Sequence, residues 1–142
     1  MTKPLMVHVI TNFAGVGGAE MMLARLIQCT EQQYKHVIIA LMKTSEVYQS
    51  TLDRCQAHYA LDWNGINTLG TVSKLRTLLK KLQPATVQCW MYHANVLTSL
   101  SIIGLAQKPK VVWGIHHSLA SPKDESISTK IALGISKILS QQ

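Results

Sequence analysis

The stretch from Leu5 to Arg25 constrains the fold of this chain more than any other. Its first six residues, Leu5 to Ile10, form a short apolar run with enough β-branched residues to be a strand. A glycine-rich turn follows, and from Ala19 onward apolar residues recur at helical spacing. Such a strand–turn–helix unit aims backbone N–H groups and a helix N-terminus at one spot, which suits an anion such as phosphate.

The rest of the chain repeats this alternation of strand and helix. Four further strands are predicted, at His36–Met42, His58–Leu61, Thr86–Met91 and Lys110–Ile115. Helices are predicted at about 45–55, at Thr68–Leu82, at about 92–106 and from Ser121 onward. Strands that alternate with helices through short links indicate an α/β fold, a Rossmann-like three-layer domain with a parallel sheet covered on both faces.

The helix Thr68–Leu82 has the clearest periodicity. The pattern places one apolar stripe against the sheet, made of Leu69, Val72, Leu75, Leu79 and Leu82. Its opposite side is basic, so contact with anionic lipid is one interpretation and a solvated face is the simpler one. The dipeptide Gln83-Pro84 ends the helix.

Composition narrows the class of protein. The 142 residues include 14 Lys and Arg against 7 Asp and Glu, but no basic run resembles a nucleic-acid arm, so no nucleic-acid partner is expected. The three cysteines make no metal pattern, and no signal peptide or membrane span is predicted. We therefore expect a cytoplasmic protein without a metal, with peripheral contact at the inner face of the membrane left open.

Ligands of parallel sheets bind beyond the carboxyl ends of the strands. Three segments are expected to meet there: Gly15–Gly18, Tyr92–Asn95 and His116–Ser118. The glycine segment is not a dinucleotide fingerprint, because Glu20 stands where the last glycine belongs and no acid follows the second strand. A kinase-type phosphate loop is excluded too, because no GK[ST] sequence is present.

Three segments carry a resemblance to a known family. They are Val16–Glu20 (VGGAE) after the first strand, Gln83–Asn95 (QPATVQCWMYHAN) and Val111–Ser118 (VVWGIHHS). In order and spacing they resemble the N-terminal domain of retaining glycosyltransferases with the GT-B fold, the group 1 or family 4-like enzymes. Nothing in the chain matches that family's second, donor-binding domain with its E-x7-E pair of glutamates.

The resemblance implies a function and a set of site residues. Residues 1–142 would be the acceptor-side half of an enzyme that transfers a sugar from a nucleotide-sugar donor to a glycan or lipid-linked acceptor in cell-surface polysaccharide or lipopolysaccharide synthesis. No cofactor is implied, and the donor would be bound mainly by the C-terminal domain, so this chain alone is expected to be inactive. The implied catalytic residue is His117, and the implied substrate-binding residues are Gly17, Gly18, Glu20, His93, His116 and Ser118.

Two other classes of function stay open at this point. One is an α/β binding module without catalysis, and the other is a nucleotide-binding domain of an oxidoreductase. The histidines at positions 8, 36 and 58 lie on or beside strands away from the expected site, and we interpret them as structural.

Overall fold

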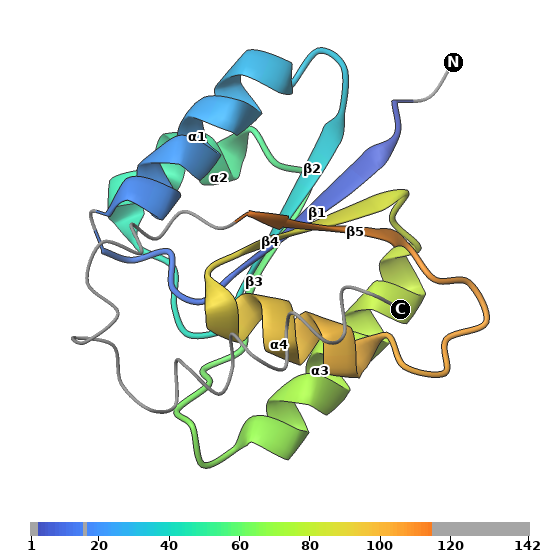
Figure 1. Cartoon of the computed structure of the whole chain (residues 1–142). Helices are drawn as coiled ribbons and strands as arrows, with labels where there is room; N and C mark the ends of the chain where they lie inside the picture. The colour runs from blue at the N-terminus through green and yellow to red at the C-terminus, as the bar shows by residue number, and fades with distance from the viewer. Residues whose placement is uncertain (1–2, 16, 115–142) are drawn as a thin grey trace.

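The computed structural model describes residues 3–15 and 17–114, and these residues form a five-stranded parallel sheet with helices on both faces (Figure 1). The strands are β1 (Leu5–Ile10), β2 (Lys35–Ala40), β3 (Ala57–Ala60), β4 (Thr86–Trp90) and β5 (Lys110–Gly114). The helices are α1 (Gly18–Thr30), the short 3₁₀ helix η1 (Glu46–Tyr48), α2 (Gln49–Asp53), α3 (Thr68–Leu82) and α4 (Tyr92–Ser101). The predicted Rossmann-like α/β fold is confirmed.

The strand order is β3-β2-β1-β4-β5, with β1 at the centre. His8 of β1 is in register with Ile38 on one side and with Gln88 on the other. The chain runs from β1 outward through β2 to β3 and then crosses to β4 and β5. The order therefore reverses between β1 and β4, and this switch point is where open α/β sheets form a ligand crevice.

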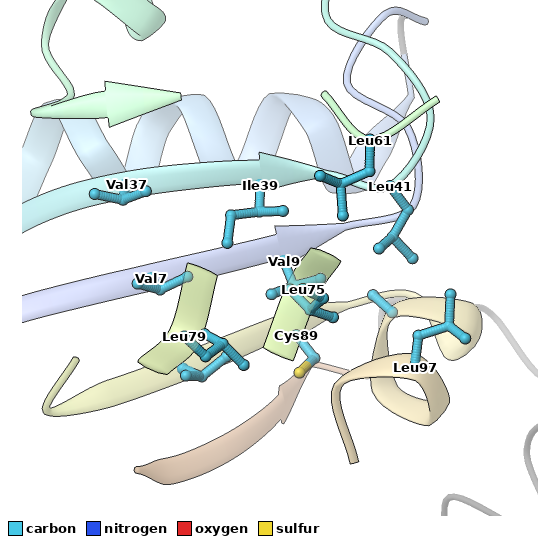
Figure 2. Packing of buried hydrophobic residues seen from close by; sticks show 12 residues of the cluster. Val7, Val9, Val37, Ile39, Leu41, Leu61, Leu75, Leu79, Cys89 and Leu97 are labelled. Atoms are coloured by element: carbon cyan, nitrogen blue, oxygen red, sulfur yellow. The ribbon is translucent and has the colours of Figure 1, made fainter. Parts of the chain in front are cut away.

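Successive side chains of a strand point to opposite faces of the sheet, so the apolar strands form two hydrophobic clusters, one on each face. On one face of the sheet, Val7, Val9 and Val37 pack against Leu75 and Leu79 of α3 (Figure 2). On the other face Ile10, Ile38 and Ala40 pack with Leu23 and Ile27 of α1. Because β1 and β2 are buried on both faces, their sequences read as continuous apolar runs.

Helix α3 has the bounds that its sequence predicts, and its ends have clear causes. Gln83 takes the left-handed conformation, with φ of 46°, and its N–H donates to the carbonyl of Leu79. Pro84 follows and cannot continue a helix. One member of the predicted stripe is wrong: Leu69 is 88% exposed, because the first turn of α3 extends beyond the sheet surface that Leu75 and Leu79 cover.

Other predicted elements end earlier than expected. The second strand stops at Ala40, and the helix after β4 stops at Ser101. Ser45 does act as a cap, since its Oγ accepts from the N–H of Val47 at 3.3 Å, but it begins η1. The predicted helix from Ser121 lies outside the described residues.

Candidate functional site

The loop between β1 and α1 is held in place by two aromatic rings. Phe13 is fully buried and stacks on Tyr48 with 4.2 Å between ring centroids. The N–H of Phe13 donates to the carbonyl of Lys43, and the hydroxyl of Tyr48 donates to the carbonyl of Gly15 at 2.7 Å. The glycine-rich turn is thus fixed against the segment that follows β2.

The N-terminus of α1 holds a carboxylate from its own chain. Gly17 is the N-cap residue and has no side chain to cap the helix, while Glu20 in the first turn is only 7% exposed. A Cβ on Gly17 would overlap Oε2 of Glu20, whereas a Cβ on Gly18 would meet no atom within 4 Å. The glycine at position 17 therefore gives room to Glu20, and a negative charge already lies where the helix dipole favours one.

The charge of Glu20 affects the pKa of Tyr48. Burial raises the pKa of the Tyr48 phenol, and the nearby Glu20 carboxylate raises this pKa further. Both effects keep the phenol protonated, so it can continue to donate its hydrogen bond to Gly15.

A second helix N-terminus lies at the same edge of the sheet, on the opposite face. Met91 joins β4 to α4 with φ of 78° and ψ of 160°, a conformation that non-glycine residues rarely adopt. It is the N-cap of α4 and gives no side-chain cap. The first amides of α4, at Tyr92 and His93, therefore point out of the helix end beyond β4.

Two buried polar atoms at this edge lack hydrogen-bond partners within the described part of the chain. Oδ1 of Asn95, in the first turns of α4, belongs to a side chain that is 1% exposed. The second atom is Oγ1 of Thr11, the residue directly after β1. Ile10, the last residue of β1, is in register with Trp90 of β4, so Thr11 lies at the end of both strands. Helical side chains lean toward the helix N-terminus, so the side chain of Asn95 lies over the first turn of α4. Burying such groups unpaired is costly, which makes both of them candidates for ligand contact.

An aromatic pair stands beside the N-terminus of α4. The rings of Trp63, in the loop after β3, and His93 of α4 have centroids 5.3 Å apart and planes tilted by 48°. Nε1 of Trp63 donates to Oγ1 of Thr68 at 3.0 Å, which fixes the indole. Burial lowers the pKa of His93, so this imidazole is neutral at pH 7.

The predicted site residues fall into three groups. Gly17, Gly18 and Glu20 form the N-terminus of α1, and His93 lies in the first turn of α4. The structure brings both helix ends to the carboxyl edge of the sheet, as the alternation of elements predicts. His116, His117 and Ser118 lie outside the described residues. Sequence reasoning placed Asn95 in the expected segment Tyr92–Asn95 without giving it a role, and it missed Thr11 and Trp63, although Thr11 is a polar residue directly after β1.

Within the part of the chain that the structure describes, other features give no second centre for chemistry. In residues 3–15 and 17–114 no group of three or more potential ligands is placed to hold a metal ion. Burial raises the pKa of the Cys55 and Cys89 thiols to about 12, so neither is a thiolate at neutral pH. A hollow of about 580 Å³ lies at the opposite edge, where β4 and β5 begin, and Pro84, Lys80 and Lys108 are among its lining residues.

The fold defines the class: a Rossmann-like α/β domain whose strand order reverses between β1 and β4. Among solved structures, the chain is similar to dTDP-glucose 4,6-dehydratase from Bacillus anthracis in complex with NAD, with a TM-score of 0.55 and 11% identity. The match covers 95% of this chain and 49% of the dehydratase chain, so this chain spans about half of its length. No protein-family model matches, and no curated protein matches.

This comparison corrects the enzyme class expected from the sequence. The sequence predicts part of a retaining GT-B glycosyltransferase, but a solved structure that the fold matches is a dehydratase, which contradicts that enzyme class. A parallel sheet that alternates with helices is a fold on which proteins carry many different reactions. Short motifs around the glycine-rich turn therefore report the fold and leave the reaction undetermined.

The lengths and hydropathy of the helices decide whether any of them could span a membrane. None of the helices in the described ranges is both long and apolar enough to cross a lipid bilayer.

Proposed function

We propose that this chain binds a ligand of the nucleotide-sugar class at the carboxyl edge of β1 and β4. The observation that carries the proposal is the pair of buried, unpaired oxygens at this edge, Oγ1 of Thr11 and Oδ1 of Asn95. Hydroxyl groups of a sugar or ribose would donate to these oxygens, since a hydroxyl both donates and accepts hydrogen bonds. Ligand sites are usually formed before the ligand binds and contain a few polar groups that fix its orientation.

The phosphate groups of the ligand belong at α4 in this proposal. Neither α1 nor α4 has a side-chain cap at its N-terminus, but α1 already has the Glu20 carboxylate buried at its end. A ligand phosphate at α1 would meet that negative charge, whereas the first turn of α4 has no acidic residue. The backbone at the N-terminal end of α4, where the helix dipole favours negative charge, would therefore contact the phosphate.

The Trp63–His93 pair supports a ring on the same ligand. The indole is fixed by its bond to Thr68, and aromatic faces bind sugar or base rings by stacking. The dehydratase of similar fold is named for dTDP-glucose and contains NAD, which gives two ligand types to compare.

Calorimetric titration of the full chain with dTDP-glucose, UDP-glucose and NAD tests the proposal. We expect the nucleotide sugars to bind and Thr11→Val to weaken their binding by about tenfold, which corresponds to the loss of one hydrogen bond to a buried oxygen. The matched control is Thr51→Val, a buried threonine on α2 that lies away from β1 and β4 and should leave affinity unchanged. Absence of nucleotide-sugar binding, or equal effects of the two variants, would overturn the proposal.

A charge variant distinguishes the two helix ends. Glu20→Gln removes the carboxylate at α1, and we expect nucleotide-sugar affinity to change by less than about twofold if the phosphate lies at α4. Glu46→Gln, an exposed acid at the start of η1, is the matched control. A large gain in affinity for Glu20→Gln alone would place the phosphate at α1. Binding of NAD without nucleotide sugars would instead support the oxidoreductase-type domain.

A further inference from the structure

The two halves of the described chain carry very different charge. Between Trp63 and Gly114 the sequence contains no Asp or Glu, yet it contains six basic residues: Lys74, Arg76, Lys80, Lys81, Lys108 and Lys110. Residues 3–62 contain five basic and five acidic residues. Because α3 and α4 belong to the first of these segments and cover one face of the sheet, that face is positive while the face under α1 and α2 is balanced (Figure 1).

The outer side of α3 continues this asymmetry along its length. Its exposed residues recur at helical spacing and form one stripe: Leu69, Gly70, Ser73, Lys74, Thr77, Lys80 and Lys81. The stripe is apolar at the N-terminal end and basic at the C-terminal end. A 15-residue helix extends over about 22 Å, so the stripe can lie along a flat surface.

Apolar side chains at the start of this stripe extend into solvent. Ile66, in the loop before α3, is 94% exposed, and Leu69 is 88% exposed. Ile103, just after α4, is a further exposed apolar residue, at 55%. Nη1 of Arg76 donates to the carbonyls of Ser101 and Ile103, and these bonds hold the end of α4 beside α3. Exposed isoleucine and leucine at one end of a helix whose other exposed side chains include three lysines and no acid mark a surface for a partner that is both apolar and anionic.

We propose that the α3–α4 face binds the surface of an anionic lipid bilayer. Ile66 and Leu69 would enter the boundary between headgroups and acyl chains, and the lysines of α3 would contact lipid phosphates. A nucleic acid would use the lysines but would gain little from the two apolar side chains, so the exposed Ile66 and Leu69 favour lipid. The inference goes beyond the proposed ligand site, since it concerns a different surface and none of the residues proposed to bind that ligand.

Co-sedimentation of the full chain with lipid vesicles tests this inference. We expect binding to vesicles of phosphatidylglycerol and phosphatidylcholine, and at least tenfold weaker binding to phosphatidylcholine alone. A basic residue near an anionic membrane contributes about fivefold to binding, so Lys80→Glu with Lys81→Glu should weaken binding at least about twentyfold. Ile66→Ser with Leu69→Ser should weaken it by about tenfold at any salt concentration.

Matched variants on the opposite half serve as controls. Val47→Ser removes an apolar side chain that is 67% exposed beside Glu46, and Lys35→Glu with Lys43→Glu reverses two exposed lysines. These variants should bind vesicles nearly as well as the original chain, and circular dichroism should show that all variants are folded. Equal binding to neutral vesicles, no vesicle binding, or equal losses from the control variants would overturn the inference. Binding to RNA or heparin that depends on the lysines and not on Ile66 and Leu69, without vesicle binding, would identify a polyanion site instead.

Discussion

Nε2 of His8 lies 2.9 Å from Nδ1 of His36, and both imidazoles are buried between the sheet and α1. The direction of this hydrogen bond follows from its neighbours. Nε1 of Trp90 lies 3.3 Å from Nδ1 of His8, and an indole N–H can only donate, so Nδ1 of His8 accepts. His8 therefore carries its proton on Nε2 and donates to His36.

The hydrogen-bond chain continues from His36 to Thr30 at the end of α1. With Nδ1 of His36 accepting, its Nε2 carries the proton and donates to Oγ1 of Thr30 at 3.0 Å. Thr30 in turn donates to the carbonyl of Leu26 at 2.6 Å. Four side chains thus form a one-directional hydrogen-bond chain in which both histidines are neutral, which supports the interpretation of His8 and His36 as structural.

The chain of donors predicts a specific tautomer for each histidine. At pH 7 we expect both His8 and His36 to be neutral with the proton on Nε2, because any other arrangement would place two donors or two acceptors face to face. Nitrogen-15 NMR of the imidazoles measures this directly. A proton on Nδ1 of either ring would contradict the arrangement.

Stability should depend on pH through the same pair. Burial, with a smaller contribution from His36, lowers the pKa of His8 from 6.5 to about 3, and burial also lowers the pKa of His36. The unfolded chain therefore binds more protons below pH 6.5 than the folded chain does. For His8 the stabilisation is full above pH 6.5 and is lost as the pH falls from 6.5 toward 3, by up to about 1.4 kcal/mol per pH unit. His36 adds a loss in the same direction, because its pKa is lowered too.

Urea unfolding at several pH values between 7.5 and 4 checks this dependence. His8→Gln should flatten the decline between pH 6.5 and 4.5, because one of the two titrating groups is gone. His58→Gln, at an exposed position, is the control and should leave the slope as it is. The same slope in both variants would show that His8 is not the group responsible.

Two leucines of α3 should differ sharply in their contribution to stability. Leu75 is fully buried among Val9, Val87 and their neighbours, so Leu75→Ala should lower the free energy of unfolding by about 2–5 kcal/mol. Leu69→Ala should change it by less than about 0.5 kcal/mol, since Leu69 is 88% exposed. Chemical denaturation of the two variants gives the comparison, and similar losses would contradict the placement of α3.

The end of α3 offers a stabilising substitution. Gln83 is exposed and has a φ of 46°, a conformation that costs little for glycine and more for other residues. Gln83→Gly should therefore raise the free energy of unfolding by about 0.5–1 kcal/mol. Lys81→Gly, inside the helix, should lower it by a similar amount. A thermal melt of each variant is sufficient, and a fall in stability for Gln83→Gly would be the contrary result.

Much of the fold could be predicted because its signals are local. Strand β1 and helix α3 have the predicted bounds, since a β-branched apolar run and a helical repeat ending at Gln83-Pro84 are legible in a short window. The glycine turn also predicted the edge of the sheet where the candidate site lies. The reaction could not be predicted in the same way, because the turn VGGAE is compatible with several Rossmann-like classes of protein.

The sequence by itself determined the order of strands and helices in this protein and the placing of polar residues after strands. Only the tertiary structure decided which residues meet: His8 with His36 across neighbouring strands, Trp63 of a loop with His93 of α4, and Glu20 over Gly17. It also decided that Leu69, which fits the apolar repeat, lies outside the core. The physical reason is that periodicity is set by the backbone of one element, whereas contact and burial depend on the register and packing of several.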